Sequence, residues 1–93
     1  MSEAEWVPIQ NVDGAFTRNA KAPGARINRY SDGMYQACAN AFRHHGASPS
    51  ISVILHTNTE EDAERLAVIA VAIVTQAMDA LIATERQNDG GTR

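Results

Sequence analysis

The clearest pattern in the chain is the apolar stretch near its C-terminus. Apolar residues recur at helical spacing over residues 66–83, and Thr59-Glu-Glu-Asp62 before them has the form of a capping box that ends in Asp. Three acids in a first turn also suit the positive end of a helix dipole. These features predict a long helix over residues 60–87. A strand through residues 68–74 is the alternative, since that stretch is apolar and β-branched.

Upstream of this helix, several short stretches have the pattern of strands. Residues 50–57 alternate and are rich in β-branched side chains, which favours a strand. Residues 6–12 and 15–18 flank Asp13-Gly14, which suits a two-residue hairpin turn. The sequence Ala22-Pro23-Gly24-Ala25 fits a type II turn, and residues 26–30 follow it as a short polar strand.

Between these strands, residues 33–45 are predicted to form a second helix. An apolar stripe recurs there at helical spacing, made of Met34, Tyr35, Cys38, Ala41, Phe42 and His45. Ser31 or Asp32 suits its N-cap and Gly46 its C-terminal end. If the strands on either side lay parallel, this helix would form a crossover between them. The expected fold is therefore α+β: one domain over residues 1–93, with a small antiparallel sheet, helix 33–45 and helix 60–87.

The apolar side of the long helix is too wide for a helix that lies on one sheet. Its apolar residues cover an arc of about 220°, where a surface helix needs about 100–140°. At 1.5 Å per residue the helix would be about 42 Å long, against about 30–33 Å for a compact domain of this length. We therefore expect a homodimer through this helix, with interface residues Leu66, Ile69, Ile73, Val74, Met78 and Leu81. A helix placed centrally within one chain is the alternative.

Composition limits the function more than it identifies it. The 93 residues are 44% hydrophobic and 20% charged, which is typical of a globular domain, and a chain this short buries only a small core. The net charge of −3 argues against a generally basic nucleic-acid coat protein. The single Cys38 cannot form an internal disulfide, so nothing requires an oxidising compartment.

Candidate catalytic and metal-binding groups do not converge in the sequence. Cys38 and His45 are about 10 Å apart along a helix, and no short Cys or His spacing typical of zinc sites is present. No nucleophile-elbow motif singles out a serine, and the acids at residues 60–64 are explained by capping. We expect no enzymatic activity, no cofactor and no metal.

The remaining hypothesis is a binding protein. Residues 14–31 contain four basic residues and no acidic residue. The expected contacts with a protein partner, or alternatively with nucleic acid through the basic hairpin 18–29, are Trp6, Arg18, Lys21, Arg26, Arg29 and Tyr30.

No membrane segment is expected, because residues 66–83 are Ala-rich and contain Gln76 and Asp79. The acidic N-terminal sequence does not have the form of a signal peptide, so a cytoplasmic location is expected. With its Ala/Thr/Asp-rich stretch 63–84 and polar end 88–93, the chain resembles short accessory proteins of actinobacterial bacteriophages. This resemblance implies a regulatory protein that binds a host protein. Residues 26–57 resemble swapped-hairpin regulators that bind DNA, but the β-rich close of that family is missing.

Overall fold

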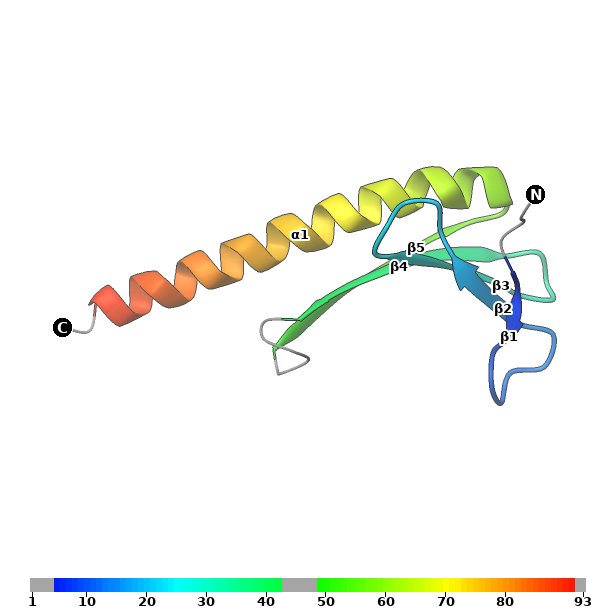
Figure 1. The fold of residues 1–93 in the computed structure, drawn as a ribbon, viewed down its shortest axis with the longest axis horizontal. Coiled ribbons are helices and arrows are strands. Elements are labelled where there is room, and N and C mark those ends of the chain that lie inside the picture. The colour runs from blue at the N-terminus through cyan, green and yellow to red at the C-terminus, as the bar shows by residue number, and fades with distance from the viewer. Residues whose placement is uncertain (1–4, 43–48, 92–93) are drawn as a thin grey trace.

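The computed structural model describes residues 5–42 and 49–91, which form one antiparallel sheet and one long helix (Figure 1). The strands follow one another across the sheet in chain order: β1 (Val7–Pro8), β2 (Phe16–Asn19), β3 (Ala25–Arg29), β4 (Tyr35–Phe42) and β5 (Ser50–Thr57). The helix α1 (Glu60–Gly91) follows β5 after a short turn and runs along one face of the sheet. The predicted α+β class, the strand at residues 50–57 and the long C-terminal helix are confirmed.

The start of α1 is fixed by the residue that the capping pattern indicates. The Thr59 hydroxyl oxygen accepts a hydrogen bond from the backbone N–H of Asp62 at 3.1 Å, and the Thr59 carbonyl accepts one from Ala63 at 3.0 Å. Three acids occupy the first turn. The helix continues to Gly91, a few residues past the predicted end at residue 87.

The predicted helix 33–45 is wrong, because residues 35–42 form the strand β4. Strand β4 lies between β3 and β5 and pairs antiparallel with both, so the predicted crossover is wrong as well. Along β4 the burial alternates: Ala37 and Ala39 are buried under α1, whereas Asn40 and Phe42 are exposed on the other face. Of the supposed helix end, His45 and Gly46 lie outside the described residues.

The supposed helix cap at residues 31–33 is a hairpin turn between β3 and β4. The Tyr30 carbonyl accepts a hydrogen bond from Gly33 at 3.1 Å, and the Tyr30 N–H donates to the Met34 carbonyl at 2.9 Å. The Asp32 carboxylate accepts from the Met34 N–H at 3.0 Å. Gly33 has a φ of +90°, which is a conformation that glycine adopts without strain. The pair Asp32-Gly33, which also suits a helix N-terminus, therefore forms a hairpin turn in this protein.

Substitution of Gly33 tests this turn. Alanine in the left-handed region costs about 1 kcal/mol, and nothing lies within 4 Å of the position of the added methyl, so backbone strain is the only penalty. We expect Gly33→Ala to lower the free energy of unfolding by about 1 kcal/mol in urea denaturation. Gly33→Asn should cost less, because asparagine tolerates this conformation better. Equal losses for the two variants would contradict the role of φ.

The N-terminal hairpin differs from the prediction. Strand β1 comprises only Val7–Pro8, and a longer loop takes the place of the expected two-residue turn at Asp13-Gly14. Ile9 donates a backbone hydrogen bond to Ala15 across this loop at 2.9 Å, and Asn11 and Gly14 both have positive φ. The turn before β3 agrees better, since Gly24 has the positive φ that the third position of a type II turn requires.

The core between sheet and helix is built mainly from alanine. Buried alanines of the sheet meet buried alanines of α1, with Val74 among them: Ala25, Ala37, Ala39, Ala67 and Ala70. Small side chains let the helix lie close to the sheet, but each buries little apolar area. Among the described residues, Ile27 is the only large side chain that is fully buried. The radius of gyration is 16.1 Å, against about 12 Å for a compact domain of this length, so the fold is elongated.

Candidate functional site

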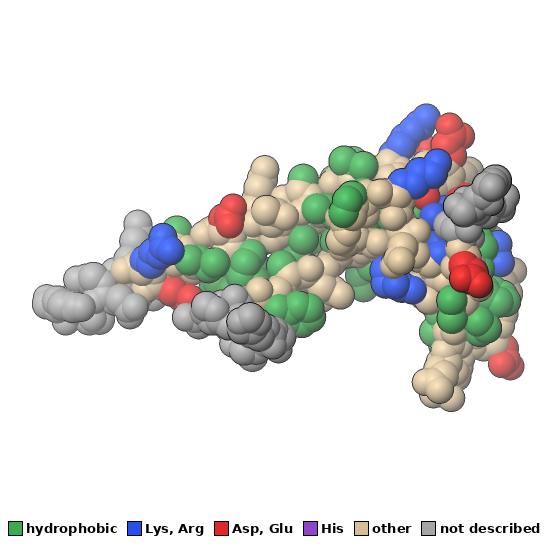
Figure 2. Space-filling model, viewed as in Figure 1, with side chains coloured by type: hydrophobic (Ala, Val, Ile, Leu, Met, Phe, Trp, Pro, Cys, Tyr) green, Lys and Arg blue, Asp and Glu red, His purple; other side chains and the backbone are tan. Residues whose placement is uncertain are grey.

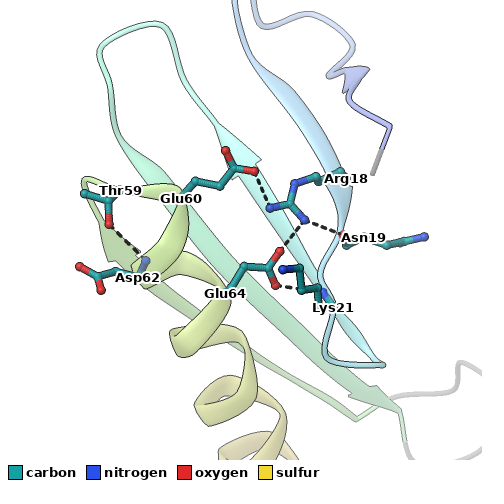
Figure 3. Close-up of polar contacts among 7 residues, drawn as sticks. All are labelled: Arg18, Asn19, Lys21, Thr59, Glu60, Asp62 and Glu64. Atoms are coloured by element: carbon teal, nitrogen blue, oxygen red, sulfur yellow. Dashed lines mark hydrogen bonds and ion pairs between the residues drawn. The ribbon is translucent and has the colours of Figure 1, made fainter. Parts of the chain in front are cut away.

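The most connected polar site joins β2 to the first turns of α1 (Figure 3). The Arg18 guanidinium is only 4% exposed, and it contacts the carboxylates of Glu60 at 2.7 Å and Glu64 at 2.6 Å. It also donates to the Asn19 carbonyl at 3.1 Å. The second Glu64 oxygen accepts the backbone N–H of Lys21 at 2.9 Å. Since Glu60 and Glu64 lie one helical turn apart, a single arginine fastens β2 to α1, and we call this group the Arg18 clamp.

The clamp holds its charges at neutral pH. Burial by itself lowers the pKa of Arg18, but hydrogen bonds and charge from Glu64 and Glu60 more than reverse this and raise the pKa. Burial likewise favours a higher pKa for Glu64, and the Lys21 N–H together with Arg18 outweighs it and lowers that pKa. These shifts come from paired charges, so they indicate a structural ion pair.

Next to the clamp, two arginines stack on aromatic rings. The Arg29 guanidinium carbon lies 4.3 Å from the centroid of the Trp6 ring and 5.1 Å from that of Phe16. The Arg18 guanidinium carbon lies 4.9 Å from the Trp6 ring centroid. Three of the predicted partner contacts, namely Trp6, Arg18 and Arg29, are therefore occupied by one another and by the helix.

The opposite face of the sheet, which α1 leaves open, is polar. Cross-strand pairing places Thr17, Asn28, Gln36 and His56 in one row across the sheet. Gln36 accepts hydrogen bonds from the Asn28 amide at 3.3 Å and from the Tyr30 hydroxyl at 3.0 Å, and its amide lies 3.0 Å from the His56 ring.

Arg26 is a basic residue of this open face. It donates to the Thr17 hydroxyl at 3.2 Å and to the Asn19 side chain at 2.7 Å. Two exposed apolar side chains, Phe42 and Ile54, lie on the same face of β4 and β5. Burial raises the pKa of the Cys38 thiol, so the thiol stays protonated at neutral pH. The predicted basic patch is thus divided: Arg26 lies on the open face, while Arg18 and Arg29 lie on the side of the helix.

The predicted dimer residues are also divided between two sides of α1. Val74 and Met78 are buried at 4% and 7% exposure within their own chain, and Val74 belongs to the core between helix and sheet. Leu66 packs against the edge of the core, and Leu81 is partly buried. Ile69 and Ile73 remain 48% and 42% exposed. Figure 2 shows hydrophobic side chains spread along most of α1.

Val68, which is not among the predicted interface residues, is 60% exposed. It falls on the other side of the helix from Ile73, about 140° away around the helix axis. The position of Val68 around the helix follows from helical spacing alone, but its exposure follows only from where the sheet lies.

The described residues hold few groups suited to other chemistry. Among residues 5–42 and 49–91, no cluster of three or more His, Cys, Asp or Glu side chains could hold a metal ion. His44 and His45 lie outside the described residues. A shallow hollow at the β2–β3 turn is lined by alanines, Asn19, Pro23, Gly24 and Arg26, and it contains no acid or nucleophile.

The segment Glu60–Arg86 is long and apolar enough to cross a membrane by length and composition, and only 22% of its most apolar window is buried in the fold. Comparisons of the chain with protein-family models, with curated proteins and with solved structures found no match.

Proposed function

We propose that this protein is a non-enzymatic binding module that works as a homodimer, with the Ile69 and Ile73 side of α1 as its dimer interface. The observation that carries the proposal is the exposure of these two side chains in the first half of the helix. Exposed apolar patches on soluble proteins mark sites of interaction. A second copy supplies an equally apolar surface, and two-fold pairing covers both patches at once.

A membrane is a poorer occupant of this surface than a second copy. The same helix turns that carry Ile69 and Ile73 are packed against the sheet through Ala67, Ala70 and Val74. If α1 crossed a bilayer, β4 and β5 would enter it with an open edge and a polar face, and such structures do not occur in hydrocarbon. A cytoplasmic location belongs to the same proposal, since the single cysteine requires no oxidising compartment.

Nucleic acid is the weaker candidate partner. Affinity for nucleic acid comes mostly from arginine and lysine that neutralise phosphates. In the hairpin 18–29, Arg18 is neutralised by two glutamates and Arg29 is stacked on aromatic rings, which leaves Lys21 and Arg26. This charge distribution favours a protein as target. The open face, with Arg26, Tyr30, Phe42 and Ile54, offers the mixed amide, aromatic and apolar surface that suits such a partner.

A regulatory role towards a host protein, as the resemblance to phage accessory proteins implies, belongs to the same proposal. In this proposal α1 forms the dimer interface, and the open face of the sheet binds the target protein.

Substitution of Ile73 by a charged residue tests the dimer. Ile73→Glu places a charge in the proposed interface, and we expect the dissociation constant of the dimer to rise by at least about 30-fold, the effect of losing about 2 kcal/mol of binding. Light scattering coupled to gel filtration, at about 100 µM protein, should give twice the 10.0 kDa chain mass for the wild type and about the chain mass for the variant.

Thr75→Glu is the matched control, because Thr75 is also exposed on α1 and lies on the other side of the helix from Ile73. This variant should stay dimeric. A wild type that is monomeric at this concentration, or that sediments with neutral lipid vesicles, would contradict the proposal.

A further inference from the structure

The two edges of the sheet differ in how well they are protected against pairing. At one edge, β1 has only two residues, and one of them is Pro8, which cannot donate a backbone hydrogen bond. At the other edge, β5 has eight residues, none of which is proline, lysine, arginine, aspartate or glutamate. Natural proteins protect exposed edges with short strands, proline or charge. The edge of β5 carries none of these devices.

Contacts of α1 show which of its sides faces this open edge. Glu64 reaches Lys21 beyond the end of β2, and a carbon added at Gly24 would lie 3.9 Å from Val71, so this side of the helix faces β2 and β3. Ile73 lies about 160° from Val71 around the helix axis. The exposed Ile73, with Ile69 about 40° from it, therefore lies on the side of the β5 edge.

The structure points to edge-to-edge assembly: we propose that a second copy of the chain pairs its β5 antiparallel with β5 and packs its α1 beside α1. This rests on the proposed homodimer and specifies its geometry. A two-fold axis perpendicular to the sheet joins the two sheets into one and keeps both helices on the same face. One contact then covers both the backbone groups on the outer side of β5, which no described strand pairs, and the apolar side of α1.

The spacing of strands and helices fits this arrangement. The helix contacts β4 and β5 to a similar extent and β3 less, so its axis lies between half a strand spacing and one strand spacing inside the β5 edge. Neighbouring strands are about 4.8 Å apart, which puts the two helix axes about 10–14 Å apart across the new strand pair. The lower end of this range meets the separation of about 8–10 Å between packed helices. Edge pairing thus brings the apolar sides of the two helices towards each other.

The positions of Val53 along β5 and of Ile69 along α1 also fit this arrangement. Val53 lies about 13 Å before the end of β5, and Ile69 lies about 13 Å after the start of α1. Since strand and helix run in opposite directions from one turn, a two-fold axis at the middle of β5 passes close to Ile69. The partly buried Ile51, Val53 and Leu55 on the helix side of β5 would be covered by the second copy.

The assembly also enlarges the open face. Ser52, Ile54 and His56 project from β5 on that face, and the second copy brings the same three residues beside them. The two exposed Ile54 side chains then lie at the centre of one continuous platform of polar, aromatic and apolar side chains. The surface assigned to the target protein is therefore completed by both copies.

Cysteine cross-linking tests this geometry. In a Cys38→Ser background, Ile69→Cys should form cross-linked dimers with a short bismaleimide, because residue 69 lies next to its symmetry mate. Val68→Cys is the matched control: it is adjacent and more exposed, but it points to the β2 side, so we expect at least about 10-fold less cross-linked product. Equal cross-linking of the two positions would overturn the inference.

Hydrogen exchange of the β5 amides tests the strand pairing separately. The outward amides of β5 should exchange at least about 10-fold more slowly in the wild-type dimer than in Ile73→Glu, because pairing protects them. A dimer with unprotected β5 amides would overturn the edge pairing and leave the proposed homodimer intact. A wild type that is monomeric in light scattering would overturn both.

Discussion

Replacing Ile27 with alanine is expected to lower the free energy of unfolding by about 3 kcal/mol, within the range for large-to-small changes in protein cores. Ile27 has no exposed surface and lies in the middle of β3, paired with Arg18 on one side and Ala37 on the other. Ile27 is the largest fully buried side chain among the described residues, so its truncation leaves a cavity beside Arg18 and Ala37. The effect is large because so few bulky side chains contribute to this core.

Urea denaturation at one fixed protein concentration measures this effect, since the stability of an oligomer depends on concentration. Ile54→Ala is the matched control, because Ile54 has the same side chain but is 51% exposed on the open face. It should cost less than about 1 kcal/mol. Similar losses for the two variants would mean that the helix–sheet core is not where the stability resides.

Glu64→Gln is expected to cost about 2 kcal/mol at neutral pH. The substitution removes one of the two carboxylates that neutralise the buried Arg18, and a buried charge that loses a partner is strongly destabilising. Glu60, which is partly exposed, compensates only in part. Glu61→Gln is the control: the same change in the same turn, at an exposed ion pair with Arg65, should cost less than about 0.5 kcal/mol.

This difference should depend on pH in a defined direction. The folded state lowers the pKa of Glu64 below its ordinary value of 4.5. The contribution of the carboxylate is therefore fully present above that ordinary value and is lost as the pH falls through the lowered pKa of the folded state. Denaturation of wild type and Glu64→Gln should give a difference that is constant near neutral pH and shrinks in acid. A difference that grows in acid would contradict the ion pair.

The sequence predicts correctly those elements that are specified by residues close together in the chain. The Thr59 cap, the acidic first turn and the apolar repeat specify α1, and the alternation in residues 50–57 specifies β5. The helix predicted over residues 33–45 is wrong because an apolar stripe at helical spacing also fits a strand, and because Asp32-Gly33 suits both a helix cap and a hairpin turn. Pairing with β3 on one side and β5 on the other overrides this local preference.

The candidate site depended on information that the sequence lacks. Closeness along the chain groups arginines 18, 26 and 29, but side chains alternate between the faces of a strand, and the register decides which face each one takes. Helix capping alone is enough to explain Glu60 and Glu64 from the sequence. Their partner Arg18 lies more than forty residues away, and no local pattern connects the three.

Sedimentation equilibrium of the wild-type chain between about 1 and 100 µM tests most directly whether a second copy covers the apolar side of α1. We expect a monomer–dimer equilibrium that approaches twice the 10.0 kDa chain mass at the upper end of this range. A mass of 10.0 kDa at every concentration would show that the chain tolerates this exposed surface alone, and would contradict the proposed assembly.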